Sequence, residues 1–401
     1  GSMRAYHFLV TVTMACSCGF CSIGLGQEGA LPVTTDLHAH GLNQQQLDSL
    51  AGVLQQAVDQ QAIAGCSFLI VHQGEVVFRE AFGFADIESE RAFTTNELVP
   101  IASVSKPVLA SVVMALVDQG KLTLDDPVEK YLPEFKDMKV KGGKPLTRRM
   151  TIRHLLSHTA GFWGNKGISA EKLDLIRNFQ RPLGEAVSRM ATYELECQPG
   201  KKFIYSGSGF CVAGRIAEVV LDQSLEDIAQ EVLFQPLGFS RTTYLPSKEI
   251  REAVPTAYSR QSRGVLERQP SRTDGELRFI LPGGSLFTTL DELAAFGVMH
   301  IENGVCHDKQ VLSRESIDEI RTLQLPQKVT RRYGLGWNCD DIDNQDLADR
   351  VFHGGAMGAY LVVDRKRQLV GAFLIHQPGQ EVAGLRNNLS QHVGKLFAPS
   401  E

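Results

Sequence analysis

The distribution of apolar residues predicts strands near both ends of the chain and helices between them. Residues 66–71 and 75–82 are two short, mostly apolar runs on either side of a Gln-Gly pair, which is typical of a tight turn between strands. Near the C-terminus, residues 360–363 and 369–375 form a second such pair around a charged turn. Strands from distant parts of the chain are therefore expected to share one sheet.

Helical patterns account for most of the remaining chain. Residues 43–61 and 381–397 predict one helix at each end, and residues 103–281 predict mainly helices separated by polar and glycine-rich loops. Short helices are also predicted from Thr151 and near Thr289. The pattern predicts an α+β fold, in which a sheet built from both ends is flanked by the terminal helices and a mainly helical domain is inserted. The expected domains are 27–102 with 283–401, and 103–282.

Composition and charge narrow the classes of function. The chain has 401 residues and a net charge of −5, with both signs scattered along it. Nucleic acid is disfavoured as a partner because no basic run occurs, and no segment beyond the N-terminus is long and apolar enough to span a membrane. The five cysteines after residue 27 are far apart, which argues against a disulfide framework or a zinc site. Cys66 and Cys211 lie in apolar runs and are expected to be buried free thiols.

Residues 1–26 carry a pattern typical of export. Two residues precede Met3 and indicate a remnant of cloning. Arg4 is followed by an apolar stretch and then by small residues, with cleavage expected before Gln27, as in a secretory signal peptide. A lipoprotein signal that uses Cys16 is the alternative. Either signal predicts a secreted or periplasmic protein.

A serine and a lysine three residues apart begin a strongly apolar helical segment. Ser103 and Lys106 lie on one helix face, so the amine can help to remove the proton from a hydroxyl that is otherwise a weak nucleophile. A lysine in a closed, partly desolvated site can have its pKa lowered enough for that role. The same spacing recurs at Ser169 and Lys172, but charged neighbours there predict a solvated surface. Context, and not the motif alone, favours Ser103.

Two further segments can supply the remaining parts of an acyl-transfer site. Tyr205 is followed by Ser206 and Gly207 in a glycine-rich turn, and His353 begins a His-Gly-Gly-Ala segment just before a predicted strand. A tyrosine beside a lysine cation can have a depressed pKa and accept the serine proton. Glycines next to a strand let a substrate approach the backbone closely. A nucleophile, a base and donors to an oxyanion are the parts that acyl transfer needs.

In this order and spacing, the segments resemble those of the serine β-lactamase and penicillin-binding protein superfamily, and most of all class C β-lactamases and the related family VIII carboxylesterases. Supporting segments are 154–161 (HLLSHTAG), 283–284 (GG) and 333–337 (YGLGW), and the resemblance extends over residues 45–397. It implies a β-lactamase-like fold, with an antiparallel sheet flanked by helices, an inserted helical domain and the active site in a cleft between them. It also implies no cofactor and no metal.

The resemblance implies a role for each candidate residue. Ser103 would be the nucleophile that becomes acylated, Lys106 would keep the site positive and share the proton relay, and Tyr205 would be the general base. The backbone N–H groups of Ser103 and Ala356 would form the oxyanion hole. Substrate contacts are expected at His353, Gly354, Gly355, Ser206 and Gly207. Trp163 either lines the cleft or packs in the core.

Two departures from the family pattern bear on the substrate. Gly207 replaces an asparagine whose amide contacts an acyl-amide group in class C-like relatives, and His353 and Gly354 replace a lysine and a threonine that help to hold the β-lactam carboxylate. A neutral histidine and a glycine supply less positive charge and one hydroxyl fewer. Both changes favour a carboxylic ester over a β-lactam. β-Lactamase or D-Ala-D-Ala carboxypeptidase activity is one alternative, and a non-catalytic relative that senses such ligands is another.

A His-x-His pair at His38 and His40 suggests a metal-dependent amidohydrolase, but no further histidine cluster supports that class. The expected partner is a small-molecule ester or amide, and the oligomeric state is left open. Of the other residues, we expect Trp337 in the core, His300 on the surface and the acidic run 340–343 in a solvated loop.

Overall fold

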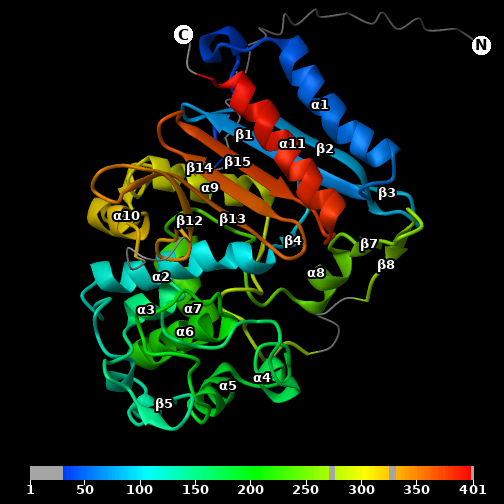
Figure 1. Ribbon diagram of the computed structural model, residues 1–401. Helices are drawn as coiled ribbons and strands as arrows, with labels where there is room; N and C mark the ends of the chain where they lie inside the picture. Colours follow the sequence, from blue (N-terminus) through cyan, green and yellow to red (C-terminus); the bar gives the residue numbers. More distant parts are fainter. Residues whose placement is uncertain (1–29, 271–275, 325–330, 399–401) are drawn as a thin grey trace, which may run out of the picture.

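The computed structural model describes residues 30–270, 276–324 and 331–398. Within them, a seven-stranded antiparallel sheet has the strand order β12-β13-β14-β15-β1-β2-β3. Helices flank the sheet, and a second group of helices lies below it in Figure 1. The predicted α+β class, an antiparallel sheet flanked by helices, is confirmed.

The elements follow one another along the chain with these bounds. The strands are β1 Gly65–His72, β2 Glu75–Asp86, β3 Arg91–Ala92, β4 Val99–Pro100, β5 Lys139–Val140, β6 Lys144–Pro145, β7 Tyr258–Arg260, β8 Leu266–Arg268, β9 Phe287–Thr288, β10 Val305–Cys306, β11 Lys309–Gln310, β12 Asn338–Ile342, β13 Ala348–Gly354, β14 Tyr360–Asp364 and β15 Leu369–Leu374. The α-helices are α1 Gln44–Asp59, α2 Ser105–Asp118, α3 Ile152–Leu156, α4 Ala170–Asp174, α5 Leu183–Met190, α6 Gly207–Leu221, α7 Leu225–Ala229, α8 Lys248–Ala253, α9 Leu290–Ile301, α10 Arg314–Ile320 and α11 Gln380–Leu396. Short 3₁₀ segments are η1 Leu37–His40, η2 Ala102–Val104, η3 Val128–Lys130 and η4 Pro133–Phe135, and η5 Gln230–Phe234 is a π-helical turn.

The centre of the sheet joins the two ends of the chain. β1 pairs with β2 across a turn in which Gln73 has φ +52° and Gly74 has φ +82°. Two successive positive φ angles suit a tight hairpin turn. On its other side β1 pairs with β15, with Leu69 opposite Ala372. The prediction that strands from both ends share one sheet is therefore confirmed.

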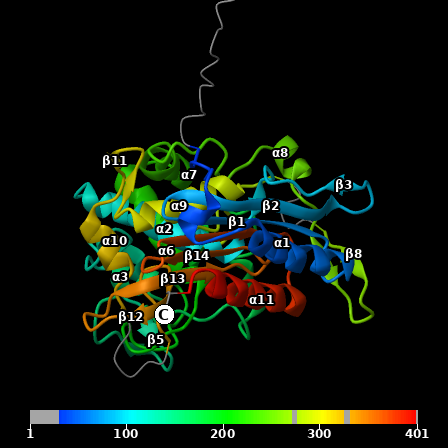
Figure 2. The same ribbon diagram turned by 90° about the horizontal axis from the view of Figure 1, so that it is seen from above.

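Helices cover both faces of β1, whose side chains alternate between two cores. Phe68 packs in a cluster with α1 and α11 on one face, and Leu69 packs in a second cluster with α9 on the other. Figures 1 and 2 show α1 and α11 side by side along the sheet. Gly297 lets α9 approach the sheet closely, because a β-carbon there would lie 2.7 Å from Val370 Cγ1. All eight residues of β1 are buried as a result.

The strands β12 and β13 correct one expectation. The acidic run 340–343 was predicted to be a loop, but Asp340 and Ile342 lie in β12, at the edge of the sheet. An edge strand exposes side chains to water, so charged residues are compatible with it. Arg350 of β13 stands opposite Asp340 in the register and forms an ion pair with it at 3.4 Å.

The helix α2 lies at the top of the second group of helices, just below the sheet in Figure 1, and contacts α6, α10 and η5. It is buried along its length from Ser105 to Leu116. The apolar pattern after Ser103 therefore reflects a helix that is covered on all sides. Such burial fixes the position of whatever functional groups begin the helix.

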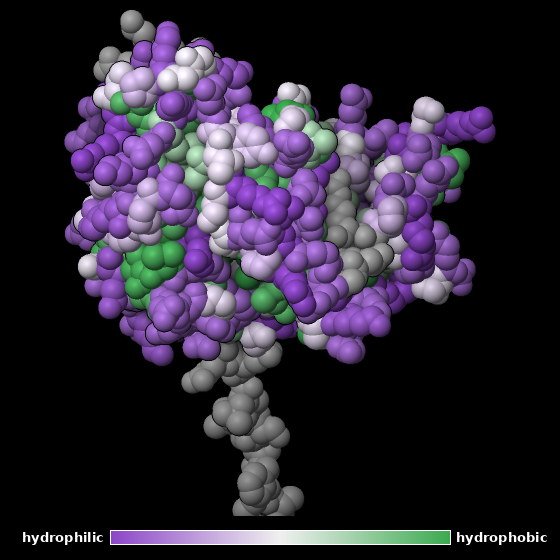
Figure 3. Space-filling view, turned by 90° about the horizontal axis from the view of Figure 1, so that it is seen from below, coloured by the Kyte–Doolittle hydropathy of each residue, from purple (hydrophilic) through white to green (hydrophobic). Residues whose placement is uncertain are grey.

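The part of the chain between residues 103 and 281, which separates the two segments that form the sheet, is less helical than predicted. Its helices are joined by long loops and by the small hairpins β5–β6 and β7–β8. The domain limits at 102/103 and 282/283 stay a prediction. Seen from below in Figure 3, this side of the molecule is mostly hydrophilic with small apolar patches. No helix within the described ranges is long and apolar enough to cross a membrane.

Three single-residue expectations are decided by burial. Cys66 and Cys211 are buried free thiols, and Trp337 is a core residue, as predicted. The surface position expected for His300 is wrong: its ring packs edge-on against Phe296 and Trp337, and burial lowers its pKa to about 3. The predicted export signal at residues 1–26 lies outside the described residues.

Candidate active site

Ser103 lies in a short turn that enters α2. It belongs to η2, and the preceding Ala102 has φ +45°, which is uncommon for a residue with a side chain. Ser105 holds this turn, because its Oγ donates to the Ala102 carbonyl at 2.6 Å and accepts from the Leu286 N–H at 3.1 Å. A strained turn that its surroundings hold in place therefore presents the half-buried Ser103 hydroxyl.

Lys106 is bound to this hydroxyl. Its side chain is 2% exposed, and Nζ donates to Ser103 Oγ at 3.0 Å and to the Gly283 carbonyl at 2.9 Å. Such acceptors compensate a buried ammonium for the loss of water. Gly283 can approach because it lacks a side chain: a β-carbon there would lie 3.0 Å from Lys106 Cγ. The structure thus brings together the serine and lysine singled out in the sequence.

Tyr205 reaches the same lysine from another part of the chain. It lies in the loop that precedes α6, and the Lys106 Nζ is 4.7 Å from the centre of its ring. A cation over an aromatic face is attracted to it, and the attraction grows when both are shielded from water. Ser103 and Tyr205, 102 positions apart in the sequence, are therefore linked through one buried ammonium.

His353 lies at the end of β13, and its hydrogen bonds define its protonation. A carbonyl can only accept, so Nδ1 donates to the Gly354 oxygen at 2.8 Å, and Nε2 accepts from the Tyr333 hydroxyl at 3.1 Å. Burial, followed by the nearby Lys106 charge, lowers the pKa of His353 to about 3. The imidazole is therefore neutral around pH 7, as the substrate argument from the sequence assumed.

The glycines after His353 let the strand end approach the serine turn. A β-carbon on Gly355 would lie 2.4 Å from the Ile101 carbonyl and 3.3 Å from Ala102 Cβ. Only glycine fits such an approach. Ala356 follows directly, so its backbone N–H is close in sequence to the point where β13 touches the turn that carries Ser103.

The turn after Tyr205 is more enclosed than expected. Ser206 is 3% exposed, and its hydroxyl has no hydrogen-bond partner among the described residues. The Gly207 N–H donates to Asn165 Oδ1 at 2.9 Å, and a β-carbon on Gly207 would lie 3.4 Å from that oxygen. An asparagine amide therefore stands beside position 207 although residue 207 itself has no side chain.

Trp163 is a core residue in this structure. It is 1% exposed and packs against Phe162 and Tyr193, with the Lys172 ammonium 4.4 Å from its ring. Of the two roles left open for it, the structure supports packing. Its predicted contact with substrate is not supported, because its neighbours enclose it.

Sequence reasoning missed three residues of this centre: His158, Asn165 and Tyr333. His158 and Tyr333 were quoted only as parts of supporting motifs, and Asn165 lies in a loop with no motif of its own. The signal available for His158 was its place in a short segment that also resembles the family. Nothing in the sequence places Asn165 beside Gly207, since the pair forms only when two loops pack together.

The two histidines of the His-x-His pair have different surroundings, and only His40 is buried. The His40 Nδ1 is 3.0 Å from the His72 Nδ1, and the His40 Nε2 is 2.8 Å from a Glu75 carboxylate oxygen. His38 is exposed. Within the described ranges, no group of three His, Cys, Asp or Glu residues is arranged to hold a metal ion.

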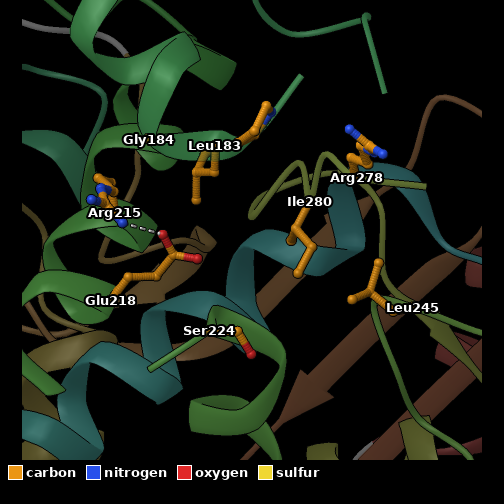
Figure 4. Close-up of a pocket in the computed structure, with 9 residues that line it drawn as sticks. Leu183, Gly184, Arg215, Glu218, Ser224, Leu245, Arg278 and Ile280 are labelled. Carbon is orange, nitrogen blue, oxygen red and sulfur yellow. Dashed lines mark hydrogen bonds and ion pairs between the residues drawn. The ribbon is translucent and has the colours of Figure 1, made fainter. Parts of the chain in front are cut away.

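A cavity of about 320 Å³ lies between α5, α6 and the 278–280 segment (Figure 4). Its two arginines already have acidic partners: Arg215 binds Glu218 at 2.8 Å, drawn dashed in Figure 4, and Arg278 binds Glu276 at 3.2 Å. The candidate catalytic residues do not line it. The candidate site at Ser103 and this cavity are therefore lined by different residues.

The fold and the buried serine–lysine pair define the class of serine hydrolases built on a β-lactamase-like fold. The beta-lactamase family profile matches residues 50–394, and the chain belongs to that family. Esterase EstB of Burkholderia gladioli is 34% identical over 215 residues, which are 51% of this chain and 53% of EstB. Penicillin-binding protein 4 of Amycolatopsis lactamdurans is 31% identical over 293 residues, or 71% of this chain and 73% of that protein.

A solved structure shows the same fold. EstCE1, described as a hydrolase with promiscuous acyltransferase activity, matches with a TM-score of 0.76. The match covers 87% of this chain and 98% of EstCE1 at 24% identity. At that level of identity the match shows the shared architecture alone.

Proposed function

We propose that the protein is a serine hydrolase that cleaves carboxylic esters through an acyl-enzyme formed on Ser103. The observation that carries this proposal is the 3.0 Å hydrogen bond from the buried Lys106 ammonium to Ser103 Oγ, with the Tyr205 ring against the same ammonium. These groups supply a nucleophile and a means to remove its proton, which is the requirement for covalent catalysis by a serine.

In the acylation step, Ser103 Oγ attacks the ester carbonyl carbon and its proton passes to the Tyr205 oxygen. The step requires Tyr205 as a phenolate, and the Lys106 ammonium lies 4.7 Å from the centre of its ring. The carbonyl oxygen becomes an oxyanion, for which the backbone N–H groups of Ser103 and Ala356 are the proposed donors. The bond to the alcohol then breaks, and the alcohol leaves with the proton from Tyr205. In deacylation, water gives a proton to Tyr205 and attacks the acyl carbonyl carbon. The bond to Ser103 Oγ then breaks, the acid is released, and Ser103 takes the proton back from Tyr205.

The choice of an ester over a β-lactam now rests mainly on His353. Its imidazole is neutral and bonded on both nitrogens, so it offers no cation to a β-lactam carboxylate. Gly207 favours an ester less strongly than the sequence suggested, because the Asn165 amide stands beside that position. We propose neutral esters as the preferred substrates.

A second candidate is a substrate that bears a carboxylate, such as a D-Ala-D-Ala peptide. Arg386 favours it: the Arg386 Nη1 is 3.2 Å from the point where a Gly354 β-carbon would lie. The guanidinium also donates to the Gly358 carbonyl at 3.1 Å, so it is held near the end of β13. Penicillin-binding protein 4 is a relative whose name is in keeping with this candidate.

A substrate panel tests the proposal. Short p-nitrophenyl esters, nitrocefin and a D-Ala-D-Ala peptide are compared by kcat/KM, with Ser103→Ala as the blank. We expect the esters to give the highest kcat/KM. A peptide that outperforms the esters, and loses its advantage in Arg386→Met, would establish the second candidate instead.

We also propose that the protein acts outside the cytoplasm, in the periplasm or after secretion. The support is the apolar, initially basic pattern of residues 1–26. Intact mass spectrometry of the protein purified from a host with an export pathway should show the mass of a chain that begins at Gln27 or, for the alternative, of a chain that begins at a lipidated Cys16. The mass of the uncleaved chain would contradict the proposal.

A further inference from the structure

His158 is the point at which two loops of the site are joined. It lies just after α3, and its φ is +57°, a conformation that few residues other than glycine adopt. Its carbonyl accepts from the Ile204 N–H at 2.8 Å, and its Nδ1 accepts from the Ser206 N–H at 3.0 Å. Both neighbours of Tyr205 in the chain are therefore bound to one residue.

The imidazole ring also supports the phenol directly. Its centre is 4.5 Å from that of Tyr205, with the planes inclined by 38°, and it is 5.0 Å from the rings of Phe210 and Tyr333. His158 is 2% exposed. A smaller side chain would leave a cavity directly beside the Tyr205 ring, and a closely packed interior adjusts poorly to such a loss.

The hydrogen bonds fix the imidazole as neutral. A backbone N–H can only donate, so Nδ1 must be unprotonated and the ring proton resides on Nε2. That Nε2 has no hydrogen-bond partner among the described residues. Burial, followed by the charge on Lys106, keeps the pKa of His158 well below its ordinary value. Protonation would break the bond to Ser206 and place a second cation in the site.

We propose that His158 is a positioning residue, which holds the Tyr205 phenol against Lys106 by binding the backbone on both sides of Tyr205 and by supporting its ring. It takes up no proton during the reaction. This inference rests on the base role proposed for Tyr205 and extends it, because it names the residue through which the α3 loop controls the base. The strained φ of His158 fits this role, since strain persists where the surroundings fix a residue for function.

Two substitutions separate the contributions of His158. His158→Asn offers an oxygen to the Ser206 N–H and tolerates positive φ, but it removes the ring. His158→Phe keeps a ring and leaves the Ser206 N–H buried without an acceptor. For each folded variant we expect kcat for a p-nitrophenyl ester to fall by roughly 5- to 100-fold, the range expected for a lost buried hydrogen bond or a displaced group. KM should change little, because substrate contacts are retained.

A double-mutant cycle with Tyr205→Phe provides the decisive readout. If His158 acts through the phenol, neither substitution lowers kcat further once the phenol oxygen is gone. His300→Phe is the matched control, because His300 is also buried against aromatic rings and its Nε2 has no hydrogen-bond partner in the described part of the chain. It should lower the melting temperature without lowering kcat of the folded enzyme.

The outcomes are distinguishable. Wild-type kcat in both His158 variants, or losses that multiply with that of Tyr205→Phe, would overturn the positioning role while leaving the proposed hydrolase function in place. A wild-type rate in Tyr205→Phe alone would instead remove the base role, and the inference about His158 with it.

Discussion

Two Ser-x-x-Lys segments of this chain have the same spacing and entirely different surroundings. At the first, the Lys106 ammonium is buried and donates to Ser103 Oγ and to the Gly283 carbonyl. At the second, the Ser169 Oγ accepts from the backbone N–H of Lys172 at 3.3 Å and caps α4. The Lys172 ammonium lies over the ring of Trp163, away from its serine. One pair is joined side chain to side chain, and the other is an ordinary helix start.

The difference arises from the neighbours and not from the motif. Ser103 follows a residue with positive φ that Ser105 ties to Leu286, so the hydroxyl is held at a fixed place. Ser169 has ordinary extended backbone geometry, as helix caps do. A reactive serine needs an imposed position, a buried amine with acceptors, and a third group from another loop. Only the first segment has all three.

Ser103→Ala against Ser169→Ala is the comparison with the largest expected effect. Ser103→Ala should abolish hydrolysis of p-nitrophenyl esters, because it removes the attacking oxygen, while circular dichroism and the melting temperature show an intact fold. Ser169→Ala should hydrolyse at the wild-type rate. Loss of activity in both variants, or in neither, would contradict the assignment of the nucleophile.

Tyr205→Phe against Tyr193→Phe compares the aromatic partners of the two lysines. The Lys106 ammonium lies 4.7 Å from the Tyr205 ring, and the Lys172 ammonium lies 5.3 Å from the Tyr193 ring. Tyr205→Phe should lower kcat by roughly 10²- to 10⁴-fold, the usual effect of losing a general base. Tyr193→Phe should not change it. An unchanged rate in Tyr205→Phe would assign the proton transfer to Lys106 alone.

The acid stability of the protein tests whether its buried histidines are neutral. Burial lowers the pKa of His353 and His300 to about 3 and that of His154 to about 4, from 6.5. Below pH 6.5 the unfolded chain binds protons that the folded one does not, so the free energy of unfolding falls as pH decreases. Each histidine contributes about 1.4 kcal/mol per pH unit down to its folded pKa.

Urea unfolding between pH 7.5 and 5 measures this dependence. His353→Gln should show a shallower decrease than the wild type, because one titrating group is gone. A free energy of unfolding that does not depend on pH in this range would mean that these histidines are not held neutral.

Substitutions in the second motif, at Ser169 and Lys172, are expected to have the smallest effects. Ser169→Ala removes a cap from the short helix α4 and should lower the free energy of unfolding by about 1 kcal/mol. Lys172→Met should keep most of the contact with Trp163 and leave kcat unchanged. A large loss of activity in either variant would show that the two motifs are not as different as the structure indicates.

The sequence was sufficient for most of the fold, and the reason is visible in particular strands. β1 and β2 were predicted because their apolar runs meet at a Gln-Gly turn, and α2 because its apolar pattern begins beside a recognisable motif. β12 was missed because an edge strand can be charged, so the run around Asp340 looks like a loop. The order of the strands in the sheet could not be predicted, because it depends on pairing between segments that are far apart in the sequence.

The residues of the candidate site also fall into those that the sequence could predict and those that it could not. Ser103, Lys106 and His353 could be named from spacing and resemblance, because each lies in a short segment of distinctive composition. The roles of His158 and Asn165 could not, since they depend on hydrogen bonds between residues 48 and 42 positions apart. Trp163 was ambiguous because an aromatic residue after a glycine suits both a cleft and a core, and only its burial decides between them.

The central claim is that Ser103, and not the second serine of the same motif, carries the acyl group. Intact mass spectrometry after a short incubation with a fluorophosphonate or an activated ester measures this directly. We expect one covalent adduct on the wild type and on Ser169→Ala, and no adduct on Ser103→Ala. An adduct that persists on Ser103→Ala, or that disappears from Ser169→Ala, would contradict it.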